Sequence, residues 1–280
     1  MATLGLIAGA GRFPLVVAEC ARRGGERVVA VAVRGAASPE LARYVDRLYW
    51  VGLGQLGRII RCLKREGVTS AVLAGTVAHR RMFTPLKILR YRPDWRMVRF
   101  WYRRLRGDRR ADTILSAFAD ELASEGIQVE NSLKRVPHLT VGSGCLTRRQ
   151  PTEREWKDIR LGWNLAKAMG GLDVGQTVVV KDGAALAVEA IEGTDETIRR
   201  GARLGHGEVV VVKVAKPNQD LRFDVPTVGP RTVEVMAEAG ARVLAIEAHR
   251  TLVLDREELI RRADQANLTV IALTAEDLPH

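Results

Sequence analysis

Short apolar runs alternate with amphipathic segments in the first half of the chain, and this alternation predicts its fold. Each run is bounded by glycine or polar residues, as expected of a buried strand. Between the runs, apolar residues recur at helical spacing, for example Leu56, Ile60 and Leu63. Strands that alternate with helices predict a parallel, doubly wound α/β sheet. The expected strands are residues 3–8, 28–33, 48–51 and 70–74.

The second half of the chain has a different pattern, which predicts an α+β domain. Two apolar segments, 176–180 and 184–189, flank Lys181-Asp182-Gly183, which is a strong hairpin signal. The apolar run at 208–212, a glutamate followed by four valines, predicts a further buried strand. Short strands and helices continue from there to the C-terminus.

The chain has 280 residues, which is enough for two domains. We expect a linker at residues 137–151, which begins and ends with proline and contains Gly142-Ser143-Gly144. It would separate an N-terminal domain, residues 1–136, from a C-terminal domain, residues 152–280.

Composition suggests a cytoplasmic protein. The three cysteines are odd in number and widely spaced, which suits a reducing compartment and gives no zinc-binding spacing. No apolar run is long enough to cross a bilayer, and the N-terminus lacks the basic start of a secretory signal.

The net charge of +11 is concentrated in one segment. The segment from Arg80 to Arg110 contains eleven arginines and one lysine but only two acidic residues, Asp94 and Asp108, which gives a local charge of +10. Such a balance suits nucleic acid, an anionic membrane surface or a polyanionic substrate.

A helix expected at residues 94–105 lies inside this basic segment. Its apolar face carries Trp95, Val98, Trp101, Tyr102 and Leu105, and its other face carries Arg96, Arg99, Arg103 and Arg106. A basic amphipathic helix with aromatic residues suits the headgroup region of an anionic bilayer. Alternatively, the apolar face packs on the protein and the arginines are solvated. Nucleic acid is not favoured as a partner, because no nucleic-acid-binding motif accompanies the arginines.

A glycine turn follows the first strand. Gly9-Ala10-Gly11 is only a partial dinucleotide fingerprint, because proline occupies the place of the third glycine and Arg34, not an acidic residue, ends the second strand. The turn still offers backbone N–H groups to a phosphate at the start of a helix. The alternative is a tight turn that needs glycine only for its geometry.

The most polar stretch of the chain is Lys213–Pro230, directly after the valine strand. It contains lysines, an arginine and two aspartates, and its prolines stiffen the backbone. Cations suit a phosphate, and paired carboxylates suit a divalent metal or a general base. A solvated loop with local salt bridges is the alternative.

Several of these stretches, taken together, resemble one enzyme family along nearly the whole chain. The chain resembles the UDP-2,3-diacylglucosamine pyrophosphatases of lipid A biosynthesis, of the kind unrelated to calcineurin-like phosphoesterases. The stretches that carry the resemblance are residues 5–14, 54–57, 107–112, 175–180, 187–195 and 216–230. The last two of these stretches are the most specific motifs.

The resemblance implies a Rossmann-like N-terminal domain, a distinct C-terminal domain and a reaction. Members of this family hydrolyse the diphosphate of UDP-2,3-diacylglucosamine to UMP and 2,3-diacylglucosamine 1-phosphate (lipid X), with Mg²⁺ or another divalent metal such as Mn²⁺. Water attacks the α-phosphorus. An aspartate that is important for catalysis in the family falls on Asp224.

These considerations define the expected site. Asp224 is expected to be a metal ligand or general base, with Asp220 as its partner at the metal. The cations expected to hold the diphosphate are Lys213, Lys216 and Arg222. Expected substrate-binding residues are Gly9, Gly11, Arg12, Phe13, Gln55, Thr76, Glu192, Gly193, Thr194, Gln219 and Thr227. Weaker candidates for a second carboxylate set are Glu189, Glu192 and Asp195.

The expected partners are an acylated nucleotide sugar and, peripherally, the inner-membrane surface. A homodimer stays open. One alternative function is a non-catalytic binding protein for an acylated nucleotide or an anionic surface, which would bind without metal and release no UMP. A Rossmann oxidoreductase is disfavoured by the missing third glycine.

Overall fold

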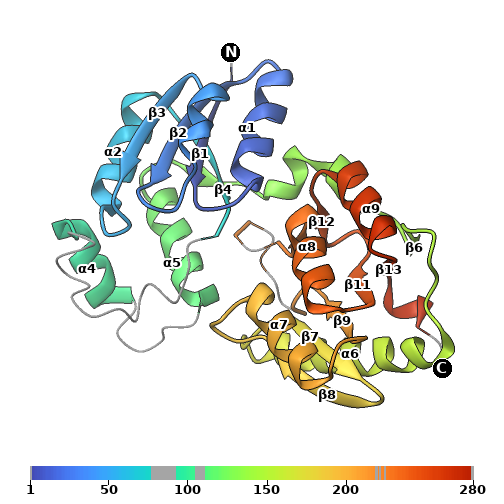
Figure 1. The fold of residues 1–280 in the computed structure, drawn as a ribbon. Helices are drawn as coiled ribbons and strands as arrows, with labels where there is room; N and C mark the ends of the chain where they lie inside the picture. Colours follow the sequence, from blue (N-terminus) through green and yellow to red (C-terminus); the bar gives the residue numbers. More distant parts are fainter. Residues whose placement is uncertain are drawn as a thin grey trace. The chain divides into compact units, whose positions relative to one another are not determined.

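The computed structural model describes residues 2–76, 93–104, 111–217, 220, 222–223 and 225–278 (Figure 1). The chain forms two compact units. The N-terminal unit contains residues 1–137 and 220–224, and the C-terminal unit contains residues 138–219 and 225–280. Each unit has its own β-sheet, and the expected α/β fold is confirmed.

The N-terminal unit contains a five-stranded sheet of order β3-β2-β1-β4-β5, in which every pair is parallel. The four strands expected from the apolar runs are all present. Because the order places β4 beside β1, the chain reverses its direction of growth there, as expected of a doubly wound sheet. The strands are β1 (Thr3–Ala8), β2 (Arg27–Val33), β3 (Arg47–Val51), β4 (Ser70–Ala74) and β5 (Gln128–Val129).

Helices cover this sheet and bury its apolar strands. The helix α2 inserts Leu56, Ile60 and Leu63 into the core beside Val29 and Val31 of the sheet, which is the stripe that the sequence spacing predicted. None of the described helices of the chain is long and apolar enough to span a membrane. The helices of this unit are α1 (Phe13–Arg23), α2 (Leu56–Arg65), α4 (Trp95–Arg104) and α5 (Ala111–Ala123).

The C-terminal unit is built on a six-stranded mixed sheet of order β6-β13-β11-β9-β7-β8. The three strands β9, β11 and β13 are parallel, whereas β6, β7 and β8 run antiparallel to their neighbours. A separate pair of short strands is β10 (Thr227–Val228) and β12 (Leu252–Val253). The strands of the large sheet are β6 (Gly144–Cys145), β7 (Thr177–Lys181), β8 (Ala184–Val188), β9 (Val210–Lys213), β11 (Val243–Glu247) and β13 (Thr269–Leu273).

Both faces of this sheet are buried, which explains the near-continuous runs of valine, alanine and isoleucine in its strands. Alternate residues point to opposite faces: Val211 and Leu244 join the core beneath α7, α8 and α9, whereas Val212 and Ala245 join the core beneath α6. The helices are α6 (Glu153–Gly171), α7 (Thr194–Leu204), α8 (Pro230–Ala239) and α9 (Arg256–Gln265).

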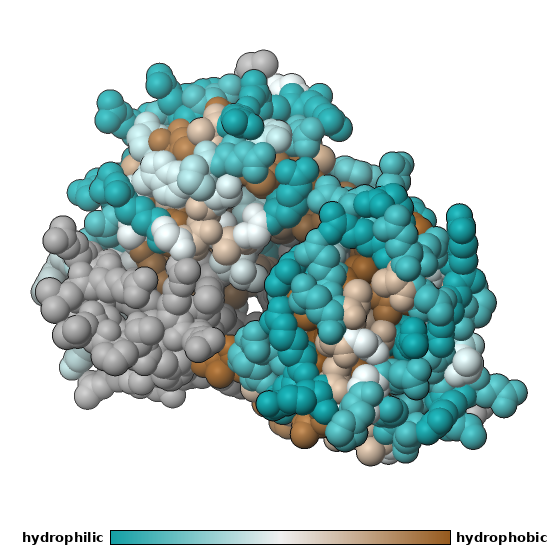
Figure 2. All heavy atoms as spheres, in the orientation of Figure 1, coloured by the Kyte–Doolittle hydropathy of each residue, from teal (hydrophilic) through white to brown (hydrophobic). Residues whose placement is uncertain are grey.

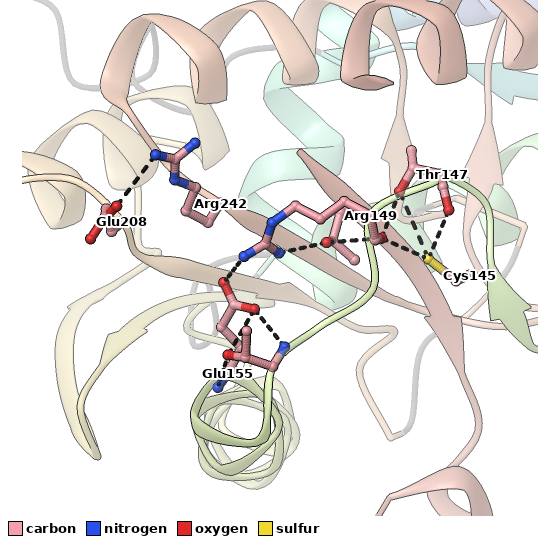
Figure 3. A network of polar contacts seen from close by, with 8 residues as sticks. Cys145, Thr147, Arg149, Glu155, Glu208 and Arg242 are labelled. Atoms are coloured by element: carbon pink, nitrogen blue, oxygen red, sulfur yellow. Dashed lines mark hydrogen bonds and ion pairs between the residues drawn. The ribbon is translucent and has the colours of Figure 1, made fainter. Parts of the chain in front are cut away.

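The sequence pattern suggested residues 137–151 as a linker; in the structure, all of them but Pro137 belong to the C-terminal unit. Strand β6 pairs with β13. Arg149 then donates from Nη1 to Thr269 Oγ1 at 2.7 Å and from Nη2 to Glu155 Oε1 at 2.7 Å (Figure 3). Glu155 also completes a capping box with Thr152 at the start of α6. The segment is therefore anchored at its middle and at its C-terminal end.

Close helix–sheet packing in this unit depends on glycine. A Cβ on Gly201 of α7 would lie 2.5 Å from the side chain of Val179, so Gly201→Ala should push α7 away from β7. We expect a loss of about 1–3 kcal/mol in the free energy of unfolding, measured by urea denaturation. Gly171→Ala is the matched control, because nothing lies within 4 Å of its added Cβ. Equal effects of the two substitutions would contradict the packing argument.

Candidate functional site

The polar edge of the C-terminal sheet brings together residues from four strands. The parallel strands β9 and β11 end there with Lys213 and Glu247. The antiparallel strand β7 begins there, with Thr177 directly opposite Lys213. Strand β8 leads into Glu189, whose N–H donates to the Thr177 carbonyl at 2.8 Å. Carboxyl ends of parallel strands are where open α/β sheets bind ligands.

Lys213 is the central residue of this edge. Its side chain is 8% exposed, and Nζ donates to the Thr194 hydroxyl at 2.9 Å. Thr194 in turn donates to Glu189 Oε1 at 2.9 Å. Within the described part of the chain no carboxylate forms an ion pair with Lys213. A buried ammonium with only a hydroxyl acceptor is suited to receive an anion.

Three buried oxygens at this edge lack hydrogen-bond partners among the described residues. They are Glu189 Oε2, Thr177 Oγ1 and Asp173 Oδ2. Thr177 is fully buried, and Glu189 is 9% exposed. Since buried polar atoms are nearly always hydrogen-bonded in native proteins, such atoms indicate a place for water or ligand.

Lys216 has a different environment, although it lies only three residues further on. Its Nζ pairs with Asp173 Oδ1 at 2.5 Å, and both side chains are almost fully buried. Asp173 follows α6 with a positive φ of 55°. The main chain at Lys216 passes close to Gly170 of the same helix, where a Cβ would lie 3.1 Å from Lys216 Cα. Lys216 is thus held against the end of α6.

A second ion pair, between half-buried Lys167 and buried Glu247, fixes the chain between these lysines. Lys167 Nζ donates to Glu247 Oε2 at 2.7 Å and to the Ala215 carbonyl at 3.0 Å. Glu247 Oε2 also accepts the Ala215 N–H at 2.7 Å. Both polar backbone atoms of Ala215 are therefore satisfied by side chains, which sets the direction in which the polar segment leaves the sheet.

The turn before α7 contains the predicted residues Glu192, Gly193 and Thr194. Gly193 has a φ of 85°, which favours glycine, and it is the N-cap of α7. Glu192 pairs with Arg200 at 2.6 Å. Burial raises the pKa of Glu192, but hydrogen bonds from its own backbone N–H and from Arg200 outweigh burial and hold that pKa below its ordinary value.

In the N-terminal unit, the glycine turn lies against the end of β4. Ala10 and Thr76 exchange backbone hydrogen bonds of 2.8 and 3.0 Å. A Cβ on Gly9 would lie 2.7 Å from the Thr76 carbonyl oxygen, so glycine is required there by this close approach. Gly11 has a φ of 97° and open space around its Cα. The structure thus brings Gly9, Gly11 and Thr76 together.

Three further predicted residues lie at helix starts in this unit. Arg12 is the exposed N-cap of α1, and Phe13 begins that helix as a buried residue. Gln55 is the N-cap of α2, where its side-chain oxygen accepts the Gly52 N–H at 2.9 Å. Gln55 follows β3, which is separated from β1 by β2, so it is not adjacent to the glycine turn along the sheet.

The middle of the polar segment belongs to the N-terminal unit. Arg222 donates from Nε to both Asp220 oxygens at 3.0 Å and from Nη2 to Oδ2 at 2.6 Å. The Arg222 guanidinium also lies 4.8 Å from the centre of the Phe223 ring, and Phe223 packs on the N-terminal core. The hydrogen bond from Arg222 lowers the pKa of Asp220 below its ordinary value of 3.8.

Two predicted residues, Asp224 and Gln219, lie outside the described residues. Thr227 opens β10, and its hydroxyl donates to the Val225 carbonyl at 2.9 Å. Asp195, on the first turn of α7, lies 3.6 Å from Arg231. No group of three His, Cys, Asp or Glu side chains that could hold a metal occurs among the residues for which coordinates are described.

Comparison with known proteins identifies the family. The model for the LpxI N-terminal domain matches residues 3–139, and the model for the LpxI C-terminal domain matches residues 142–271. The chain belongs to the LpxI family. It is 35% identical over 288 residues to the UDP-2,3-diacylglucosamine pyrophosphatase LpxI of Caulobacter vibrioides, and the alignment covers 100% of both chains. The resemblance inferred from the sequence motifs is confirmed.

A solved structure was also matched, that of the biotin carboxylase subunit of pyruvate carboxylase. It is 12% identical, and the alignment covers 74% of the LpxI-family chain and 42% of the other, with a TM-score of 0.26. A score this low carries no argument about fold or function.

Four residues of the polar edge were not anticipated from the sequence of this LpxI-family chain: Lys167, Asp173, Thr177 and Glu247. Glu247 ends an otherwise apolar strand, and Thr177 begins one. A polar residue at the end of a buried strand is a readable signal for both. Lys167 and Asp173 carry no such signal, because a lysine on a helix and an aspartate after Gly170-Gly171 are usually solvated.

The Asp220–Arg222 pair gives a testable pH dependence. Because the pKa of Asp220 is lowered in the folded state, the stabilisation from this pair is complete above pH 3.8 and is lost as the pH falls through the lower, folded-state pKa. Arg222→Gln should therefore raise the pKa of Asp220 toward 3.8, as followed by ¹³C-carboxyl NMR with Asp220→Asn for assignment. Arg242→Gln is the control. An Asp220 pKa that Arg222→Gln leaves unchanged would refute the role of the pair.

Proposed function

We propose that this protein hydrolyses the diphosphate bond of UDP-2,3-diacylglucosamine, releasing UMP and 2,3-diacylglucosamine 1-phosphate for lipid A biosynthesis. The observation that carries this proposal is the full-length similarity, across both domains, to a relative with that activity in its name. The buried Lys213 at the polar edge of the C-terminal sheet supports it, because its ammonium is bonded to a neutral hydroxyl and is available to a phosphate oxygen.

Lys213 is our choice for the main diphosphate anchor. Its ammonium is already desolvated and bonded to a neutral hydroxyl, so an arriving phosphate oxygen adds a charge-assisted hydrogen bond without breaking an ion pair. Thr194 orients Lys213 by accepting its hydrogen bond, and Glu189 orients Thr194 in turn. Arg222 and Lys216 are the further anchors, but each is already ion-paired, with Asp220 and Asp173 respectively, so we expect each to contribute less than Lys213.

In the proposed reaction, a water oxygen forms a bond to the α-phosphorus and the bond from that phosphorus to the bridging oxygen breaks. The bridging oxygen leaves with the sugar phosphate, and the phosphoryl group remains on UMP. Asp224 accepts the proton of the attacking water. Lys213 and Arg222 balance the charge that develops on the phosphate oxygens.

We further propose that Mg²⁺, or Mn²⁺ in its place, is held by Asp224 and Asp220. Asp220 has acceptor capacity for such an ion, because an ionised carboxylate offers about four lone-pair positions. Magnesium commonly takes one or two protein carboxylates and completes its shell with phosphate oxygens and water, so a larger cluster is not needed. The chemistry supplied by a bound ion of this kind is neutralisation of phosphate charge and activation of water.

The proposed substrate carries two acyl chains, so we place the protein at the cytoplasmic face of the inner membrane, bound peripherally. No nucleic acid has a part in this reaction. A homodimer stays a prediction, to be checked by the mass of the purified protein in solution.

The central test is UMP release from UDP-2,3-diacylglucosamine with Mg²⁺ and with a chelator. We expect release by the wild type with Mg²⁺, and a loss of at least about 10³-fold in kcat for Asp224→Asn, because both base and ligand are removed. The chelator should abolish release, and added Mg²⁺ should restore it in the wild type only. Tight substrate binding without any UMP release would instead support the non-catalytic binding protein.

A second test separates phosphate binding from folding. Lys213→Met should lower kcat/KM by about 10- to 100-fold, the usual cost of one charge-assisted hydrogen bond. Lys181→Met is the matched control, because Lys181 ends strand β7 at the opposite edge of the same sheet and binds the carbonyls of Gly205 and Gly207. The control should lower thermal stability and leave kcat/KM within about twofold. The assignment of Lys213 fails if both variants lose activity equally.

A further inference from the structure

The helix α4 is fixed rigidly to the N-terminal unit at its start. Asp94 Oδ1 accepts the Met97 N–H at 2.9 Å and caps the helix, while Asp94 Oδ2 accepts the Arg58 N–H of α2 at 3.1 Å. The first turn of α4 is therefore both capped and fixed to the start of α2 by the same carboxylate.

Arg96 fixes the same helix to the end of α5. Its guanidinium pairs with Glu121 and Glu125 at 2.7 Å each. Hydrogen bonds from Lys64 and Arg96 lower the pKa of Glu125 to about 2, so this attachment stays ionised at neutral pH. Since Arg96 is used inward, it does not belong to the solvated arginine face that the sequence pattern suggested.

The buried side of α4 is not the aromatic face that the sequence singled out. Phe100 is 5% exposed and lies in the N-terminal core, and Met97 packs beside it. The expected alternative, in which the apolar face of Trp95, Val98 and Trp101 packs on the protein, is therefore wrong. The reason is that the opposite side of the helix carries its own apolar residues, Met97 and Phe100, and this side packs on the N-terminal core.

The outer side of α4 exposes large apolar residues beside cations. Trp95 is 80% exposed, Tyr102 65%, Val98 44% and Trp101 40%. Arg99 and Arg103, which follow Trp95 by one and two helical turns, are exposed too. Elsewhere in the described chain, the exposed large apolar residues are Leu172, Val174, Ile191 and Leu204, and none of them is aromatic. Figure 2 shows mostly hydrophilic residues over the coloured surface.

We propose that the outer side of α4 docks on the surface of an anionic phospholipid bilayer. Tryptophan and tyrosine prefer the boundary between headgroups and acyl chains, where the ring is desolvated and its polar atom stays hydrated. Arginines beside them are attracted by the negative surface potential of anionic lipid. The inward anchors of Asp94 and Arg96 hold this surface in place, so docking requires no folding of the helix.

The charges argue for lipid over two other partners. In a symmetric contact between two copies through α4, Arg99 and Arg103 would approach the same residues of the second copy, which is repulsive. Nucleic acid would engage the arginines but leave Trp95 and Val98 exposed to water. Of these three partners, only an anionic bilayer satisfies both the apolar and the cationic residues.

This inference concerns binding and does not depend on the proposed reaction. It is tested with the full-length protein and sucrose-loaded vesicles that contain no substrate, made of phosphatidylcholine alone or mixed with phosphatidylglycerol. We expect sedimentation with the mixed vesicles only, weakened by salt, and quenching of tryptophan fluorescence by brominated acyl chains.

Two double variants separate the contributions. Trp95→Ser with Trp101→Ser should weaken binding by roughly tenfold or more and remove most of the quenching. Arg99→Gln with Arg103→Gln should weaken it about 10- to 30-fold, from about a factor of five for each arginine. The matched controls are Leu172→Ser with Leu204→Ser, and Arg203→Gln with Arg256→Gln, all on the exposed surface of the C-terminal unit.

The outcomes are distinct. Loss of vesicle binding in both α4 variants but in neither control, with circular dichroism unchanged, supports the proposal. Vesicle binding that survives in both α4 variants refutes it, as does α4-dependent binding of a DNA duplex or α4-dependent dimerisation without binding to vesicles. Turnover of detergent-dispersed substrate, measured in parallel, reports on the proposed reaction alone.

Discussion

The buried carboxylate of Glu247 determines where the polar segment leaves the C-terminal sheet. It accepts hydrogen bonds from Lys167 and from the Ala215 N–H, and Lys167 also binds the Ala215 carbonyl. Removing two charges from water is costly, and a buried pair is retained only with well-placed additional hydrogen bonds. Here those bonds go to the backbone of one residue, between Lys213 and Lys216. This arrangement sets the direction of the chain after Ala215. The ring of Trp163, whose centre lies 5.5 Å from Lys167 Nζ, supports the lysine further.

Two lysines that look equivalent in the sequence have different electrostatic roles. Lys216 is paired with Asp173, so its charge is largely neutralised and its role is to hold the fold together. Lys213 has a hydroxyl partner, and the carboxylate of Glu189 lies one hydrogen bond further away. The difference follows from the sheet: Lys213 is the last residue of β9 and faces Thr177 of β7, whereas Lys216 has already reached the end of α6. Position along the strand thus decides which cation is available to a ligand.

Much of the fold could be predicted from the sequence, because both sheets bury apolar strands whose patterns are local. The first four strands, the hairpin at Asp182-Gly183 and the valine strand all follow from runs of a few residues. The site was less predictable, because its pairings are distant in sequence: Lys167 with Glu247, Lys213 with Thr194, Lys216 with Asp173. The sequence left the orientation of α4 open for another reason. A helix with apolar residues on two sides has no unique buried face, and only the position of Asp94 and Arg96 against their partners selects Phe100.

The division of the chain at residues 220–224 has a consequence for how the protein is made. These residues belong to the N-terminal unit, although the chain on both sides of them belongs to the C-terminal unit. A fragment that stops at Pro137 would lack Phe223, which packs on the N-terminal core. On the ribosome, the N-terminal unit therefore emerges incomplete and receives its last piece only after most of the C-terminal sheet has been synthesised. Neither unit is an independent module that recombination could move to another protein as one continuous stretch.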